Sequence, residues 1–156
     1  ALMVDRPHVK NDRVDLIALI ARRLELLGRH WQIECRLDSR GGAAIPVSAS
    51  LSMEIELLIR EAISNAVRYA GAGQFTVRLA MREDQLFLSI KSDGRPPDPA
   101  QQVDEDGAER IASRSLERRI VMLGGTAYEE AISAGTLLAI RLPVEEHEGP
   151  ANPAPE

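Results

Sequence analysis

Two runs of alternating apolar and polar residues follow one another in the second half of the chain, and they constrain its fold more than any other feature. "QFTVRLAMRED" begins at residue 74 and "QLFLSIKS" ends at residue 92, with a short polar turn near Glu83 and Asp84 between them. A period of two is typical of strands that bury one face, and the short turn predicts a β-hairpin. "TAYEEAIS" and "GTLLAIRLP", nearer the end of the chain, predict a second hairpin that completes the sheet.

The N-terminal part of the chain predicts a helix followed by a strand. In "DRVDLIALIARRLELLG" the apolar residues recur at helical spacing, and we expect Asp12 to be the N-cap and Gly28 the C-cap. "HWQIECRLD" then alternates apolar and polar residues from Trp31 to Leu37. This alternation is typical of a half-buried strand.

Two further helices are expected. The first runs from about Leu51 to Tyr69, with Ser50 leading into it and "GAG" at 71–73 ending it. Its apolar stripe consists of Ile55, Ile59, Ala62, Ile63, Ala66 and Ala70. The second, "IASRSLERRIVML", ends before a pair of glycines at 124 and 125.

The order of these elements predicts an α+β fold, a two-layer sandwich in which three helices cover one face of an antiparallel or mixed sheet of about five strands. We expect one domain over residues 13–145, because 156 residues can bury one core but not two. Residues 1–12 are interpreted as a linker from a missing upstream region, and 146–156 as a disordered tail rich in acids and proline. The proline-rich, acidic stretch before the third helix is long enough to be a lid or binding loop.

Composition excludes several classes of function. The net charge is -5 and no segment concentrates Lys and Arg, so we expect no nucleic-acid partner. One cysteine, Cys35, and no run long enough to span a membrane favour a cytoplasmic domain without membrane contact. The three histidines are scattered without ligands at metal-binding spacing, and no Gly-x-Ser-x-Gly motif occurs, so a metal cluster or a hydrolase nucleophile is not expected.

The segment "EAISNAVRYA", residues 61–70, carries the strongest candidate site. Glu61, Asn65 and Arg68 are spaced i, i+4, i+7, so they form one line on the second helix beside its apolar stripe. An amide oxygen suits a hard cation, a carboxylate can manage a proton or water, and a guanidinium suits phosphate. These residue types fit a magnesium nucleotide, although a solvated helix face has the same pattern.

A resemblance to a known family favours the nucleotide site. "LLIREAISNAVRYA" resembles the N-box of the ATP-binding domain that sensor histidine kinases share with gyrase, Hsp90 and MutL, with matches at Glu61, Asn65, Arg68 and Tyr69. "SLERRIVMLGG" and "AGTLLAIRLP" resemble the closing helix and strand of kinases that pair with response regulators of the NarL type. The resemblance covers residues 13–143 and implies the Bergerat fold, with ATP and Mg²⁺ as cofactors.

The sequence departs from this family where the family holds adenine. The family pattern Asp-x-Gly-x-Gly reads "SDGRP" here, so Ser92 replaces the aspartate, Gly94 is kept and Pro96 replaces the second glycine. The lid is unusually acidic, and the glycine that precedes the third helix in the family is replaced by Ala112. Acids near a triphosphate repel it. The basic residues Arg114, Arg118 and Arg119 either reach the phosphates or form a solvated helix face.

The resemblance implies a role for each matched residue. Asn65 would coordinate Mg²⁺, Glu61 would orient the attacking group or its water, and the pair Arg68 and Tyr69 would meet phosphates or ribose. The base would be held by Ser92, Asp93, Gly94 and Thr136. The implied activity is phosphorylation of a histidine on an upstream dimerisation domain, with a response regulator as partner. Two alternatives stay open: a degenerate pseudo-ATPase that acts as an interaction module, and a serine kinase of the anti-sigma-factor type.

Overall fold

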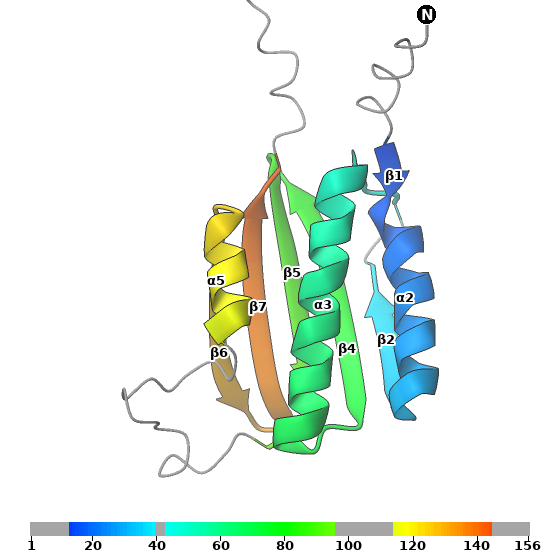
Figure 1. Cartoon of the computed structure of the whole chain (residues 1–156), viewed down its shortest axis with the longest axis vertical. Helices are drawn as coiled ribbons and strands as arrows, with labels where there is room; N and C mark the ends of the chain where they lie inside the picture. Colours follow the sequence, from blue (N-terminus) through cyan, green and yellow to red (C-terminus); the bar gives the residue numbers. More distant parts are fainter. Residues whose placement is uncertain (1–12, 40–42, 96–113, 145–156) are drawn as a thin grey trace, which may run out of the picture.

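A mixed five-stranded sheet forms one layer of the domain (Figure 1). The computed structural model describes residues 13–39, 43–95 and 114–144. In the order β2-β4-β5-β7-β6, only the pair β2 and β4 is parallel, and every other neighbouring pair is antiparallel. The strands are β2 (Glu34–Asp38), β4 (Gln74–Arg82), β5 (Gln85–Ser92), β6 (Thr126–Ile132) and β7 (Gly135–Pro143).

The second layer consists of helices on one face of this sheet (Figure 1). The helices of the described residues are α2 (Leu16–Trp31), α3 (Ala49–Ala70) and α5 (Arg114–Met122). Both predicted hairpins are present, and the α+β sandwich of three helices on a five-stranded mixed sheet is confirmed. The predicted linker, lid and tail lie outside the described residues.

The core lies between the two layers because the sheet alternates and the helices are amphipathic. In β5, Leu86, Leu88 and Ile90 are buried, whereas Phe87 and Lys91 on the opposite face are exposed. The turn of this hairpin has positive φ at Glu83 (47°) and Asp84 (66°), as a two-residue turn between twisted strands requires. The central helix α3 buries Ile55, Leu58, Ile59, Ala62 and Ile63 against the sheet. Ala66 is only partly buried, and Ala70 lies at the C-terminal end of the predicted stripe.

The predicted start of the first helix is wrong by three residues. Val14 pairs with Val47 in a small sheet of β1 (Arg13–Asp15) and β3 (Pro46–Ser48), so the backbone is extended through Asp15. Asp15 is therefore the N-cap, and its Oδ1 accepts hydrogen bonds of 3.1 Å from the amides of Ile17 and Ile45. Such short strands lack a clear alternating pattern, which is why the sequence did not predict this sheet.

The predicted end of this helix and the predicted start of α3 also differ from the structure. Gly28 is not a C-cap: α2 continues through Trp31 and ends at Gln32, in the left-handed conformation. Gly28 is the site of a close approach, because a Cβ atom there would lie 3.1 Å from the carbonyl oxygen of Ile33. Ser48, rather than Ser50, caps α3, and its Oγ accepts from the amide of Leu51 at 3.1 Å. The predicted glycine stop is confirmed, since Gly71 is the C-cap with φ 65°.

Candidate functional site

Glu61 faces α5 and contacts two of its side chains. The Ser115 hydroxyl donates a short hydrogen bond to Oε2 of Glu61, and Nε of Arg119 lies 3.7 Å from Oε1. Glu61 is half-buried, and it lines a cavity of about 330 Å³ between α3 and α5 together with Leu57, Arg60, Ser64, Ser115 and Arg119. The cavity therefore has a carboxylate on one wall and a cation on the other.

Asn65 lies one turn further along α3. Its Nδ2 atom is fully shielded from solvent and has no hydrogen-bond partner among the described residues, and the same holds for Nε of Arg119. A buried polar group left without a partner costs on the order of 1–3 kcal/mol, so such groups commonly mark a place where a ligand or an ion completes the hydrogen bonding. Nδ2 of Asn65 is such an atom, whereas Nε of Arg119 has the carboxylate of Glu61 at 3.7 Å.

A second cluster lies where β5 ends beside the start of β7. Ser92 is buried, pairs with Thr136 across the sheet, and its Oγ accepts a long hydrogen bond of 3.4 Å from the amide of Gly94. The Thr136 hydroxyl donates to the carbonyl oxygen of Gly94 at 3.0 Å. Ser92, Gly94 and Thr136, predicted to act together, are therefore in contact with one another.

This second cluster is joined to the C-terminal end of α3. The amide of Arg95 donates to the carbonyl oxygen of Ala70 at 3.2 Å, and a Cβ atom on Gly94 would lie 2.8 Å from the Cβ of Ala70. Asn65 lies five residues before Ala70, which is about 7.5 Å along a helix axis. The first cluster, Glu61 and Asn65 with Ser115 and Arg119, and the second cluster therefore both lie along α3. The separation along the helix between Asn65 and the second cluster is short enough for one nucleotide to span.

Asp93 has a structural contact at this junction. Its Oδ1 accepts hydrogen bonds from the amides of Gly73 at 2.8 Å and Gln74 at 3.0 Å, which ties the end of β5 to the segment that follows α3. These backbone hydrogen bonds, that of Gly73 first, lower the pKa of the Asp93 carboxyl. The predicted contact of Asp93 with the base stays a prediction, with this oxygen already engaged.

We expect Asp93→Asn to remove part of the acid dependence of stability. A carboxyl with a lowered pKa in the folded state stabilises it above the unfolded value of about 3.9, and this contribution is lost as the pH falls through the folded pKa. The native chain should therefore exceed Asp93→Asn in unfolding free energy at pH 7, by less than about 1 kcal/mol because solvent screens an exposed carboxylate. The difference should shrink as the pH falls below about 4. Urea unfolding at pH 7 and at successively lower pH values measures it, and a difference independent of pH would contradict this account.

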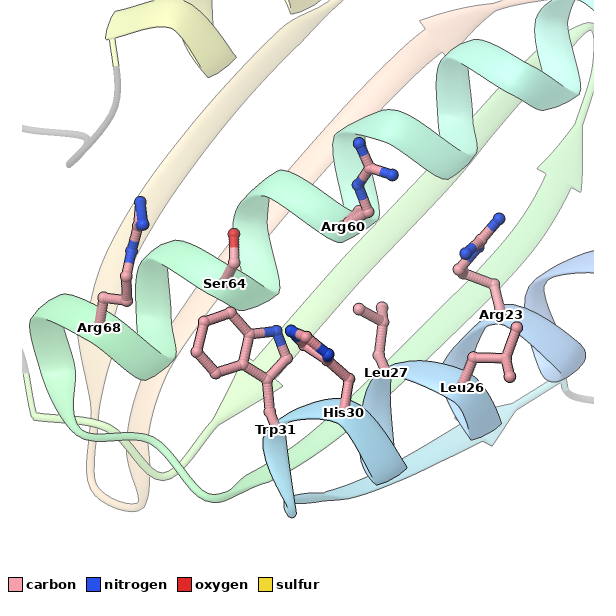
Figure 2. Close-up of a pocket in the computed structure, with 8 residues that line it drawn as sticks. All are labelled: Arg23, Leu26, Leu27, His30, Trp31, Arg60, Ser64 and Arg68. Carbon is pink, nitrogen blue, oxygen red and sulfur yellow. The ribbon is translucent and has the colours of Figure 1, made fainter.

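Arg68 and Tyr69 are placed differently from Glu61. Both are exposed, and the guanidinium of Arg68 lies 5.5 Å from the centre of the Tyr69 ring. Arg68 lines a groove that α3 forms with α2, whereas it does not line the cavity beside Glu61 (Figure 2). Glu61 and Asn65 thus lie along α3, and the cluster of Ser92, Gly94 and Thr136 lies at the C-terminal end of that helix, whereas Arg68 lines the groove with α2.

Sequence reasoning missed two residues of the site. Ser115 and Arg119 contact Glu61, although Arg119 was considered only as a phosphate contact or part of a solvated face. Arg118, its neighbour, is exposed. The position of Arg119 in the helix-closing motif "SLERRIVMLGG" was the available signal, but a motif does not give the direction in which a helical side chain points.

Other chemistry finds no support in the described part of the chain. No group of three or more His, Cys, Asp and Glu residues there could hold a metal ion. Burial raises the pKa of the half-buried Cys35 thiol to about 11, so the thiol stays protonated at neutral pH and is a poor nucleophile. None of the described helices is both long and apolar enough to cross a membrane.

Comparison with known proteins identifies the family. The family model described as histidine kinase-like ATPase domain matches residues 28–136, which include both clusters. The chain belongs to this family. The N-box resemblance stated from "EAISNAVRYA" is confirmed by this match, because the matched residues contain that segment together with the closing Gly-Thr pair at Gly135 and Thr136.

Curated relatives of the domain are sensor kinases. The chain is 27% identical over 92 residues to the sensor protein VraS of Staphylococcus epidermidis, covering 58% of this chain and 25% of that protein. It is 26% identical over 100 residues to the sensor histidine kinase NarS of Mycobacterium tuberculosis, covering 64% and 24%. The chain spans about a quarter of the length of these relatives.

Solved structures confirm the fold. The ATP-binding domain of PrrB from Mycobacterium tuberculosis superposes with a TM-score of 0.67 at 23% identity, covering 85% of this chain and 96% of that one. The histidine kinase domain of the blue-light activated kinase EL346 from Erythrobacter litoralis gives 0.68 at 19% identity, covering 87% and 64%. At these identities the likeness concerns the arrangement of helices and sheet.

Proposed function

We propose that this domain binds Mg-ATP between α3, α5 and the end of β5, as the catalytic domain of a sensor histidine kinase. The observation that carries the proposal is the shielded Nδ2 atom of Asn65, which has no hydrogen-bond partner within the described part of the chain and lies one turn along α3 from the Glu61–Arg119 pair. A nucleotide with its cation would provide partners for such atoms. Membership of the family and the kinase relatives support the same conclusion.

The donor set fits a magnesium nucleotide. Mg²⁺ prefers oxygen ligands, keeps several waters and is commonly held by one or two protein groups plus phosphates. Asn65 can offer its amide oxygen as that protein ligand once the side chain is oriented toward the cavity, and the cation would screen the phosphates and link them to α3. Arg119, on the opposite wall, places a positive charge near the position where phosphate oxygens would lie.

Glu61 is the acid–base or orienting residue of the proposed reaction. In phosphoryl transfer an acceptor nitrogen bonds to the γ-phosphorus while the bond to the β-phosphate oxygen breaks and ADP leaves, so positioning is the main task of the protein. The contacts of Glu61 with Ser115 and Arg119 hold its carboxylate in one orientation. We propose that this orientation directs the attacking group.

The cluster of Ser92, Gly94 and Thr136 is the proposed base site, with Asp93 beside it. Ser92 can accept a hydrogen bond from the adenine amino group, but without the charge of an aspartate, and charge-assisted bonds are about twice as strong as neutral ones. We therefore propose weak ATP binding. Arg68 and Tyr69 are exposed on α3. To make the predicted contact with phosphate or ribose, both side chains would have to reach the nucleotide from that exposed side of the helix.

In the full-length protein, the proposed acceptor is a histidine on an upstream dimerisation domain, and the proposed partner that receives the phosphoryl group is a response regulator. We place this reaction in the cytoplasm. One observation favours a second candidate function: Ser92 at the position of the base-binding aspartate is what a pseudo-ATPase that acts as an interaction module would tolerate.

Calorimetric titration with Mg-ATP tests the proposal. The native chain should bind, Asn65→Ala should bind at least about tenfold more weakly, and Asn65→Asp, which keeps an oxygen ligand, should weaken binding less. Chelation of Mg²⁺ should weaken binding by the native chain but change Asn65→Ala little. Equal affinity of the native chain and Asn65→Ala would show that nucleotide is held elsewhere, and no binding by the native chain would favour the interaction module.

A further inference from the structure

A groove between α2 and α3 adjoins the cavity beside α5. Both helices run in the same direction on the sheet, and their facing sides enclose about 460 Å³ (Figures 1 and 2). From α3 it is lined by Arg60, Ser64 and Arg68, at i, i+4 and i+8. From α2 it is lined by Arg23, Leu26, Leu27, His30 and Trp31. Arg60 and Ser64 also line the cavity beside Glu61, so the groove and that cavity adjoin across one ridge of α3.

The groove is basic although the chain as a whole carries a net charge of -5. Arg23 is paired with Glu56. Neither Arg60 nor Arg68 forms an ion pair within the described residues, and both are exposed. Two guanidinium groups on one ridge of α3 thus lack a carboxylate partner within that part of the chain. Such a ridge attracts an anionic group.

The groove also offers apolar surface. Leu26 is a large apolar side chain that is 46% exposed. Trp31 is half-buried, and the His30 ring packs edge-on against it with the ring centres 5.1 Å apart. Arg and Trp are the residue types most enriched where binding energy is concentrated in protein interfaces. Cations and apolar side chains on adjacent ridges favour a ligand that carries both kinds of group.

The spacing of the cations decides between a small anion and a longer ligand. Arg60 and Arg68 are eight residues apart, which places their Cα atoms about 12 Å apart along the helix axis. One carboxylate or one phosphate cannot bind two guanidinium groups at that separation. Two acidic residues seven positions apart on a second helix, about 10.5 Å, match it, and the residues between them at i+3 and i+4 share the same face.

We propose that this groove is the docking site for an acidic amphipathic helix of a partner protein. Acidic side chains at i and i+7 of that helix pair with Arg60 and Arg68, and apolar side chains at i+3 and i+4 cover Leu26 and Trp31. This is recognition of a helix by the groove between two others.

The test uses the single tryptophan as a reporter, because Trp31 lies in the groove. The probe is a synthetic helical peptide with Glu at i and i+7 and Leu at i+3 and i+4, and the matched control peptide has Gln in place of both Glu. Titration should shift the Trp31 emission saturably with the Glu peptide, at concentrations below about 1 mM, and at least about tenfold more weakly with the Gln peptide. Raising the salt concentration should weaken the binding of the Glu peptide more than the binding of the Gln peptide.

Variants of the whole chain connect the signal to the groove. Arg60→Glu should lower the affinity for the Glu peptide at least about tenfold, and Leu26→Ala should lower it several-fold. Arg22→Glu is the matched control, because Arg22 is an exposed cation of α2 that does not line the groove. It should change the affinity less than about twofold, and thermal unfolding should verify that each variant folds.

Several outcomes would overturn the proposal: no saturable shift up to about 1 mM, equal affinity for both peptides, or equal losses in Arg60→Glu and Arg22→Glu. Oligo-dT provides the remaining comparison. Binding of this single-stranded DNA through Arg60, in the absence of peptide binding, would identify a polyanion site instead. Because Leu26 is remote from Glu61 and Asn65, Leu26→Ala should titrate with Mg-ATP as the native chain does, whatever the peptide result.

Discussion

Gly135→Ala should lower the free energy of unfolding by about 3 kcal/mol or more. Gly135 begins β7 with φ 150°, a conformation that residues with a Cβ rarely adopt. A Cβ atom there would lie 2.0 Å from the carbonyl oxygen of Ser92 and 2.8 Å from Cα of Asp93, so the backbone of β5 or β7 would have to move. The close approach of Gly135 to Ser92 also supports the proposed base site of Ser92, Gly94 and Thr136, so the variant should lose the proposed ATP binding as well.

Gly73→Ala is the matched control for this substitution. Gly73 lies in the segment after α3, has no positive φ, and a Cβ atom there would meet nothing within 4 Å. Its unfolding free energy should stay within about 0.5 kcal/mol of the native value. Urea unfolding followed by circular dichroism measures both variants. A loss in Gly135→Ala no larger than that in Gly73→Ala would show that β7 and β5 can separate at little cost.

The sheet and the long helices could be predicted because their signals are local. In the first hairpin, β4 and β5 each bury every second residue over most of their length, and the predicted apolar stripe of α3 repeats from Ile55 to Ala70, over about four turns. The ends of the first helix could not be predicted, since they depend on distant contacts. Val14 is extended because it pairs with Val47, and α2 continues past Gly28, where the lack of a side chain leaves room for the carbonyl oxygen of Ile33.

The candidate site could be predicted in part, for the same reason. Glu61 and Asn65 are named by a motif within one helix, but the partners of Glu61 on α5 lie more than fifty positions away in the sequence and depend on how the helices pack. Spacing alone placed Arg68 in line with Glu61, since seven residues are close to two helical turns. In the structure, the Arg68 side chain lines the groove with α2. A local sequence pattern cannot show this contact, because α2 is distant in the sequence.

At Gly135 the sequence motif predicts the strand, and the structure explains why the strand begins with a glycine. The motif "AGT" identified the strand, whereas the structure gives the physical reason for its glycine, which is the approach of the β5 backbone. The adjacent Thr136 holds the carbonyl oxygen of Gly94. The position of Ser92 between these contacts makes it the most informative residue to change.

Ser92→Asp should tighten ATP binding by about ten- to a hundredfold and should leave GTP binding unchanged or make it weaker. The Ser92 side chain is buried beside the amide of Gly94, opposite Thr136. The sequence resemblance predicts that this is the position of the family's base-binding aspartate. A carboxylate there would accept a hydrogen bond from the amino group of adenine, whereas guanine presents a carbonyl oxygen that it would repel. The free protein should lose stability, because a buried carboxylate without a partner is costly.

Two controls separate this recognition from a general effect of charge. Ser92→Asn adds an acceptor without charge, and it should tighten ATP less than Ser92→Asp does. Ser89→Asp adds a carboxylate to the same strand on the opposite face of the sheet, and it should change neither ATP nor GTP binding. Mg-ATP and Mg-GTP titrations of the four proteins, including the native chain, measure the difference. Equal tightening of both nucleotides, or none, would mean that Ser92 does not contact the base. The alignment of "SDGRP" with the adenine-binding motif would then be wrong, and the interaction module would become the better account of the domain.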